Sequence, residues 1–110
     1  MSNQIVTISP DFLIYDSIGK SATTSSAAYA LPIDSTNTNQ WQTLFITNTA
    51  TSGFTSFELG GSGATATADS TALLAGQSMV VNRNNKTYIA LLASTGTQFI
   101  SITVGSYGSR

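Results

Sequence analysis

The chain contains no cysteine and no histidine, and only four Lys or Arg and five Asp or Glu occur among its 110 residues. It therefore cannot form a disulfide, a Cys/His zinc site, a thiol nucleophile or a Ser-His-Asp triad. A formal net charge of −1 with scattered cations also disfavours a surface that binds nucleic-acid phosphates. The sequence predicts no catalytic residue and no cofactor, and we expect the protein not to be an enzyme.

Long apolar runs are also missing from the sequence. No segment approaches the roughly 18 apolar residues of a membrane helix. The N-terminal residues Met1–Gln4 lack the basic start of a signal peptide. We therefore expect a protein made in a cytoplasm, with no membrane partner.

Serine and threonine are abundant instead, with sixteen and seventeen copies, while 41% of the residues are hydrophobic. The mean hydropathy is +0.12. Disordered chains combine low hydrophobicity with high net charge, so this composition indicates a folded protein. The length is typical of one domain, and we expect a single domain over residues 1–110.

Short runs rich in β-branched and aromatic residues alternate with turn residues along the chain. Helix-forming Glu and Lys are rare. The pattern predicts an all-β protein, a single antiparallel β-sandwich (jelly-roll-like) or a small barrel of about eight strands. The predicted strands are Gln4–Ile8, Phe12–Ile18, Ala27–Ile33, Trp41–Thr47, Phe54–Leu59, Ala64–Ala68, Ser78–Val81, Thr87–Ala93 and Gln98–Val104.

The core is expected within the clearest of these runs. In the last strand Ile100, Ile102 and Val104 alternate with hydroxyl residues, which predicts one buried face. Tyr88 and Phe99 are also interpreted as core aromatics. Residues 41–105 form the predicted core module, whereas residues 1–40 are less regular. The six positions expected in the core are Phe45, Phe57, Ile89, Leu91, Ile100 and Ile102.

The polar residues form no strong catalytic or metal-binding motif. The Gly19–Ser21 tripeptide matches the end of a P-loop, but Ile14 stands where that motif requires its first glycine. Oxygen donors at Asp34, Asn37 and Asn39 are interpreted as ordinary loop residues, because one carboxylate is too few for a strong calcium motif. The acids Asp11, Asp16, Asp34, Glu58 and Asp69 form no evident pair and are interpreted as surface charges.

Four apolar residues are candidates for contacts with a partner. Tyr29 and Trp41 flank polar loops, and large aromatic residues at such positions often anchor interfaces. Ile5 and Phe12 bound an N-terminal segment outside the regular strand pattern. We therefore predict a partner interface that includes Ile5, Phe12, Tyr29 and Trp41.

Several short motifs follow one another within residues 42–105. They are Phe45–Thr49, the glycine-rich turn Gly60–Thr65, the turn Leu74–Ser78, the strand Thr87–Ala90, the Gly96–Thr97 pair and the closing strand Ile100–Gly105. In this order they resemble small β-rich virion modules of tailed bacteriophages, which occur as capsid decoration (cement) proteins and as fibre domains. Residues 1–40 lie outside the resemblance.

The resemblance implies a structural virion protein that binds the outside of a phage capsid and stabilises it. Its implied partners are the major capsid protein and further copies of the chain, in a trimer at a threefold axis of the capsid lattice. Its location would be the capsid surface, after synthesis in the bacterial host cytoplasm. The alternatives are a tail or head fibre or spike module, and a carbohydrate-binding β-sandwich.

Overall fold

A computed structural model describes residues 12–33 and 41–107, and this part of the chain contains eight β-strands and no helix. The side chains of Phe12 and Tyr107 lie outside the description. No helix able to cross a membrane occurs among the described residues. The strands are β1 (Phe12–Ala22), β2 (Ala27–Ala30), β3 (Thr43–Asn48), β4 (Phe54–Gly60), β5 (Thr71–Leu74), β6 (Ser78–Asn82), β7 (Tyr88–Ala93) and β8 (Gln98–Tyr107).

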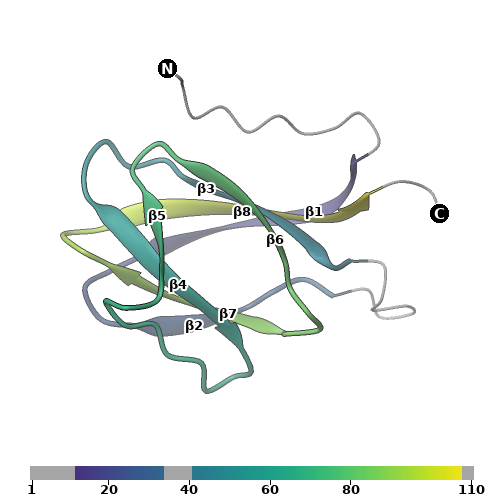
Figure 1. Cartoon of the computed structure of the whole chain (residues 1–110), viewed down its shortest axis with the longest axis horizontal. Coiled ribbons are helices and arrows are strands. Elements are labelled where there is room, and N and C mark those ends of the chain that lie inside the picture. Colours follow the sequence, from purple (N-terminus) through teal and green to yellow (C-terminus); the bar gives the residue numbers. More distant parts are fainter. Residues whose placement is uncertain (1–11, 34–40, 108–110) are drawn as a thin grey trace.

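The strands form two four-stranded antiparallel sheets, and Figure 1 shows how they are arranged in space. Sheet A has the order β1-β8-β3-β6, and sheet B has the order β2-β7-β4-β5. The first strand pairs with the last, the second with the seventh, the third with the sixth and the fourth with the fifth. Successive pairs alternate between the sheets, so the chain is one antiparallel ribbon wrapped into a jelly roll. The predicted sandwich is confirmed.

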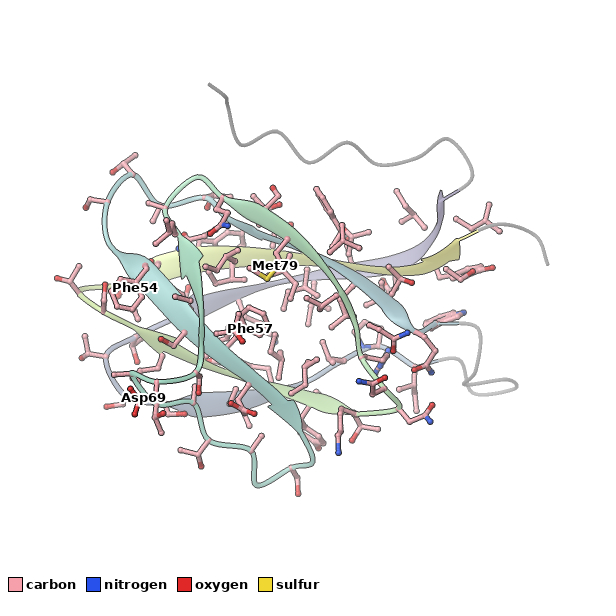
Figure 2. The ribbon with its side chains drawn as sticks, in the orientation of Figure 1. Phe54, Phe57, Asp69 and Met79 are labelled. Atoms are coloured by element: carbon pink, nitrogen blue, oxygen red, sulfur yellow. The ribbon has the colours of Figure 1, made fainter. Side chains whose placement is uncertain are left out.

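The core lies between the two sheets and follows the alternation of side chains along each strand. In β3 the buried residues are Leu44, Ile46 and Asn48, and in β8 they include Ile100, Ile102 and Val104. Phe57 of β4 lies in the middle of the molecule (Figure 2) and is only 5% exposed. Of the six predicted core residues, the buried ones are Phe57, Ile89, Leu91, Ile100 and Ile102.

Three aromatic residues predicted to be buried are not in the core. Phe45 and Tyr88 are half-buried, and Phe99 is 49% exposed. Each follows or precedes a residue that points inward, as Phe99 precedes Ile100, and neighbouring side chains in a strand point to opposite faces. The prediction was therefore wrong for these three residues, which face outward.

The strand boundaries differ from the predicted ones at a few places. The segment Ala64–Ala68 forms no strand, and the unpredicted strand β5 at Thr71–Leu74 pairs with β4 instead. Strand β1 continues to Ala22, beyond the predicted end of this strand at Ile18. The predicted strand Gln4–Ile8 lies outside the described residues.

Replacing Ile102 by alanine should lower the free energy of unfolding by about 2–5 kcal/mol, because Ile102 is fully buried and its truncation leaves a cavity. Urea denaturation followed by circular dichroism measures this change. The neighbouring substitution Thr103→Ala, on the outward side of the same strand, should cost under about 1 kcal/mol. Equal losses for the two variants would contradict the assigned strand face.

Candidate interaction surface

The outer faces of the two sheets differ in what covers them. Residues 61–70 are held against sheet B by two contacts: the N–H of Ala66 donates to Ser26 Oγ at 2.9 Å, and Ser70 Oγ donates to Glu58 at 3.0 Å. Ala66 is buried, and so is Ala90, although Ala90 faces away from the core of the sandwich. The chain therefore covers part of the outer face of sheet B itself.

The outer face of sheet A is assembled by cross-strand register. Ser17 pairs with Thr103, Thr103 with Phe45, and Phe45 with Val80, so one row crosses all four strands. The neighbouring rows are built in the same way from residues two positions away along each strand, except that Ile14 is three positions from Ser17 because of the register shift in β1. We call this surface the sheet A face; it comprises Ile14, Ser17, Gly19, Ser21, Thr43, Phe45, Thr47, Ser78, Val80, Asn82, Phe99, Ser101, Thr103 and Gly105.

None of these fourteen residues is charged, and three large apolar side chains on the face are exposed. Ile14 is 61% exposed, Phe99 49% and Val80 36%. Hydroxyls fill most of the remaining positions, and Thr47 Oγ1 lies 2.8 Å from Ser78 Oγ in a cross-strand hydrogen bond. A solvated sheet face usually carries polar and charged residues, so an uncharged face with exposed apolar side chains indicates a binding surface.

Gly19 has a specific role on this face. A Cβ atom at position 19 would overlap the tip of the Phe99 ring, which reaches across from β8 to β1. Because Gly19 has no side chain, the Phe99 ring can pack flat against the neighbouring strand β1. Gly19–Ser21, the partial P-loop match, is part of this extended strand.

A second exposed apolar group lies at the end of the sandwich where β1 begins. The rings of Tyr15 and Trp41 stack with their centroids 5.2 Å apart and their planes 4° apart. Leu13 is 41% exposed and pairs with Ser106, whose Oγ lies 3.5 Å from the Tyr15 hydroxyl. Ile33, 49% exposed, follows Pro32. We call Leu13, Tyr15, Ile33 and Trp41 the apolar end.

Arg83 holds the apolar end together from inside. It is 2% exposed, and its Nη1 donates to the carbonyls of Pro32 at 2.6 Å and Trp41 at 3.0 Å. Its Nε donates to the carbonyl of Lys86 at 2.9 Å. Burial lowers the pKa of the Arg83 guanidinium, and Nη2 has no hydrogen-bond partner among the described residues. The side chain joins the turn after β6 to the distant Pro32 and Trp41.

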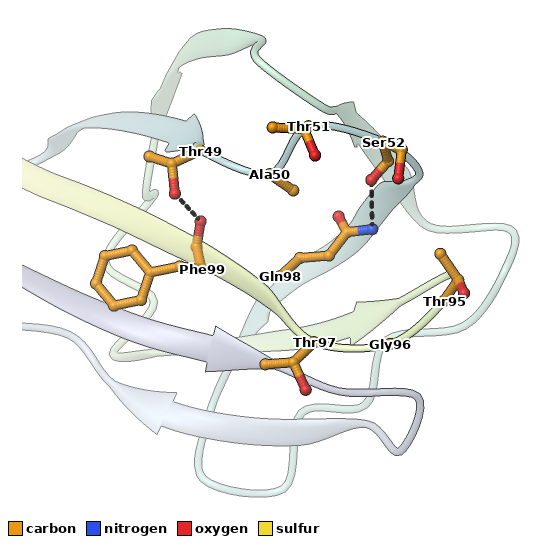
Figure 3. Close-up of a pocket in the computed structure, with 9 residues that line it drawn as sticks. All are labelled: Thr49, Ala50, Thr51, Ser52, Thr95, Gly96, Thr97, Gln98 and Phe99. Atoms are coloured by element: carbon orange, nitrogen blue, oxygen red, sulfur yellow. Dashed lines mark hydrogen bonds between the residues drawn. The ribbon is translucent and has the colours of Figure 1, made fainter.

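A network of buried amides supports the opposite end of the sandwich. Gln98 Oε1 accepts hydrogen bonds from Asn48 Nδ2 at 2.8 Å and Thr55 Oγ1 at 3.0 Å, and Gln98 Nε2 donates to the Ser52 carbonyl at 3.0 Å. Above it lies an open pocket of about 500 Å³ (Figure 3). Its lining is uncharged: Thr49, Ala50, Thr51, Ser52, Thr95, Gly96, Thr97, Gln98 and Phe99.

The predicted interface residues lie in different places. Trp41 belongs to the apolar end. The hydroxyl of Tyr29 donates to the Ser21 carbonyl at 3.1 Å, and the Lys20 ammonium lies 5.3 Å from the ring centroid, so Tyr29 links β2 to β1. Phe12 begins β1 but its side chain lies outside the description, and Ile5 lies outside the described residues.

The described acids are separate surface groups. Asp16 accepts the Ser17 N–H at 2.8 Å, Glu58 accepts the Ser70 hydroxyl, and Asp69 is exposed near the edge of the molecule (Figure 2). In the part of the chain that the structure describes, no three acidic groups come together as metal ligands. Asp11, Asp34, Asn37 and Asn39 lie outside that part.

Comparisons of the chain with models of protein families, with curated proteins and with solved structures found no match. The family resemblance based on the sequence motifs therefore stays a prediction. The structure shows the fold, the uncharged sheet A face and the apolar end.

Arg83→Met should lower the free energy of unfolding by about 2–4 kcal/mol, because three carbonyls lose their buried donor. The emission of the single tryptophan should also shift to longer wavelength as Trp41 loses its support. Chemical denaturation and fluorescence measure the two effects. Lys86→Met is the matched control, since it removes an exposed positive charge and should leave both readouts nearly unchanged.

Proposed function

We propose that this protein is a structural component of a phage virion that binds the outside of the capsid and stabilises it. The observation that carries the proposal is the apolar end. Leu13, Tyr15 and Ile33 are all more than a third exposed, and the Tyr15 ring stacks on Trp41. Large apolar side chains gathered at one place on a surface mark a protein-binding site more often than single exposed ones do.

The low number of charged residues is consistent with a protein whose role is to bind other proteins. Ordinary surfaces are about a quarter to a third charged. Here nine charged residues in 110 leave most of the surface to Ser, Thr, Ala and Asn. Such a surface loses little favourable hydration when it is covered, and it leaves few charges buried without partners. It can therefore pack against a protein shell at low cost.

The fold is compatible with this role and does not by itself assign it. Jelly rolls occur in viral capsid proteins and also in lectins, and function depends on the surface that the fold carries. The proposal assigns no catalytic residue and no cofactor. Its partners are the major capsid protein and other copies of the chain, its location is the capsid surface, and its place of synthesis is the bacterial cytoplasm.

A carbohydrate-binding function is the second candidate, because one observation favours it. The pocket in Figure 3 is uncharged and is lined by exposed threonine and serine hydroxyls, which suit a neutral sugar. Phe99, the aromatic residue of the lining, contacts Gly19 across the sheet instead of standing free beside the pocket. Capsid binding therefore has the stronger structural basis.

Recombinant protein should co-sediment at a fixed ratio with capsids of the phage whose genome encodes the chain. Leu13→Lys and Ile33→Lys should each weaken this binding at least about tenfold, because a lysine ammonium would lose water in an apolar contact. Thr95→Lys is the control, as Thr95 is exposed at the opposite end of the sandwich. Quantitative gel analysis of the pellets gives the ratio.

Absence of the protein from purified virions would contradict the proposal. Recovery with detached tails or fibres, and not with capsids, would point to the fibre alternative. Binding that is insensitive to Leu13→Lys and Ile33→Lys would remove the role of the apolar end.

A further inference from the structure

We propose that the sheet A face is the contact between two copies of this chain, packed face to face about a twofold axis. This contact would be the means of the proposed self-association, and it rests on the proposed function only in that respect. It uses residues different from those of the apolar end.

The chemistry of the sheet A face makes it complementary to itself. All six described charged residues lie off this face, so two copies meet without like-charge repulsion; these residues are Asp16, Lys20, Glu58, Asp69, Arg83 and Lys86. Hydroxyl groups both donate and accept hydrogen bonds, so a face rich in Ser and Thr can pair with an identical one. Ile14, Val80 and Phe99 add exposed apolar area.

The shape of the face suits sheet-on-sheet packing. Two sheets pack about 10 Å apart when their side chains interdigitate. Because most positions are Ser, Thr or Gly, the face is nearly flat. The Phe99 ring also lies across Gly19 instead of projecting outward. The register shift in β1 at Tyr15 lies at one end of the face, so the rows from Ser17 to Ser21 are regular.

We infer that the sheet A face packs against a second sheet A face and not against sheet B, because the outer face of sheet B is partly covered. Residues 61–70 cover part of sheet B, and Glu58 faces outward there. Contact between two identical faces is isologous and closes as a dimer. The inference therefore gives a dimer, where the capsid lattice argument from the sequence favoured a trimer.

The area of the sheet A face limits the expected affinity between the two copies. Four strands about 4.8 Å apart, with roughly six residues each, span about 19 by 20 Å. This footprint of roughly 380 Å² is below the roughly 800 Å² per partner that standard specific interfaces bury, and it is in the range of weak, transient contacts. The dimer should accordingly dissociate in the micromolar to submillimolar range. Copies held close together on a capsid would pair far more completely, since tethering raises their effective concentration.

Sedimentation equilibrium of the full chain from about 10 µM to 1 mM tests the inference. The expected result is a concentration-dependent rise from the 11.4 kDa monomer to twice that mass. Ser101→Lys, at the centre of the face, should raise the dissociation constant about 100-fold or more, because the twofold axis brings two lysines into one contact. Val80→Lys on the edge strand β6 is a second variant less exposed to folding defects. Thr95→Lys, off the face, is the control of equal charge.

Circular dichroism verifies that each variant is folded. A monomer at 1 mM, a trimer, or a dimer that tolerates both Ser101→Lys and Val80→Lys would each overturn the inference. Loss of the dimer in these variants but not in Thr95→Lys would establish it. None of these results depends on capsid binding, and Leu13→Lys and Ile33→Lys test that function separately.

Discussion

Pairing between β1 and β8 is the constraint on which the rest of the fold depends. Ten residue pairs join Phe12–Ala22 to Gln98–Tyr107, near opposite ends of the chain. The β2–β7, β3–β6 and β4–β5 pairs nest inside this first pair along the same ribbon. Contacts this distant in sequence close large loops before they stabilise anything, so the topology predicts slow folding.

The sequence predicts the fold well where a strand has one strictly apolar face. Ile100, Ile102 and Val104 alternate with Ser and Thr, and all three are buried. In β3 the run Leu44-Phe45-Ile46 is apolar at every position, so local pattern cannot tell which set points inward. Pairing with β8 decides which alternate residues of β3 face the core, since Ile46 lies opposite the buried Ile102.

The candidate surfaces are less predictable because distant strands assemble them. The sequence does not identify Ile14, Val80 or Phe99 as surface residues, and only the register of β1, β8, β3 and β6 places them on one face. The scarcity of charge was visible in the composition, but its complete exclusion from one face was not. Trp41 could be proposed from its loop position, whereas its stacking on Tyr15 and the support from Arg83 could not.

Scarcity of charge also bears on how the protein associates. Edge strands are usually blocked by charged residues, yet β6 has none and β1 has only Asp16 and Lys20. On β1 the register shift at Tyr15 and the bond from Ser17 N–H to Asp16 interrupt the free edge. Strand addition at an edge can continue without limit, whereas contact between two identical faces is finite. At the β1 edge, the interruption beside an uncharged face therefore favours closed pairing over open-ended growth.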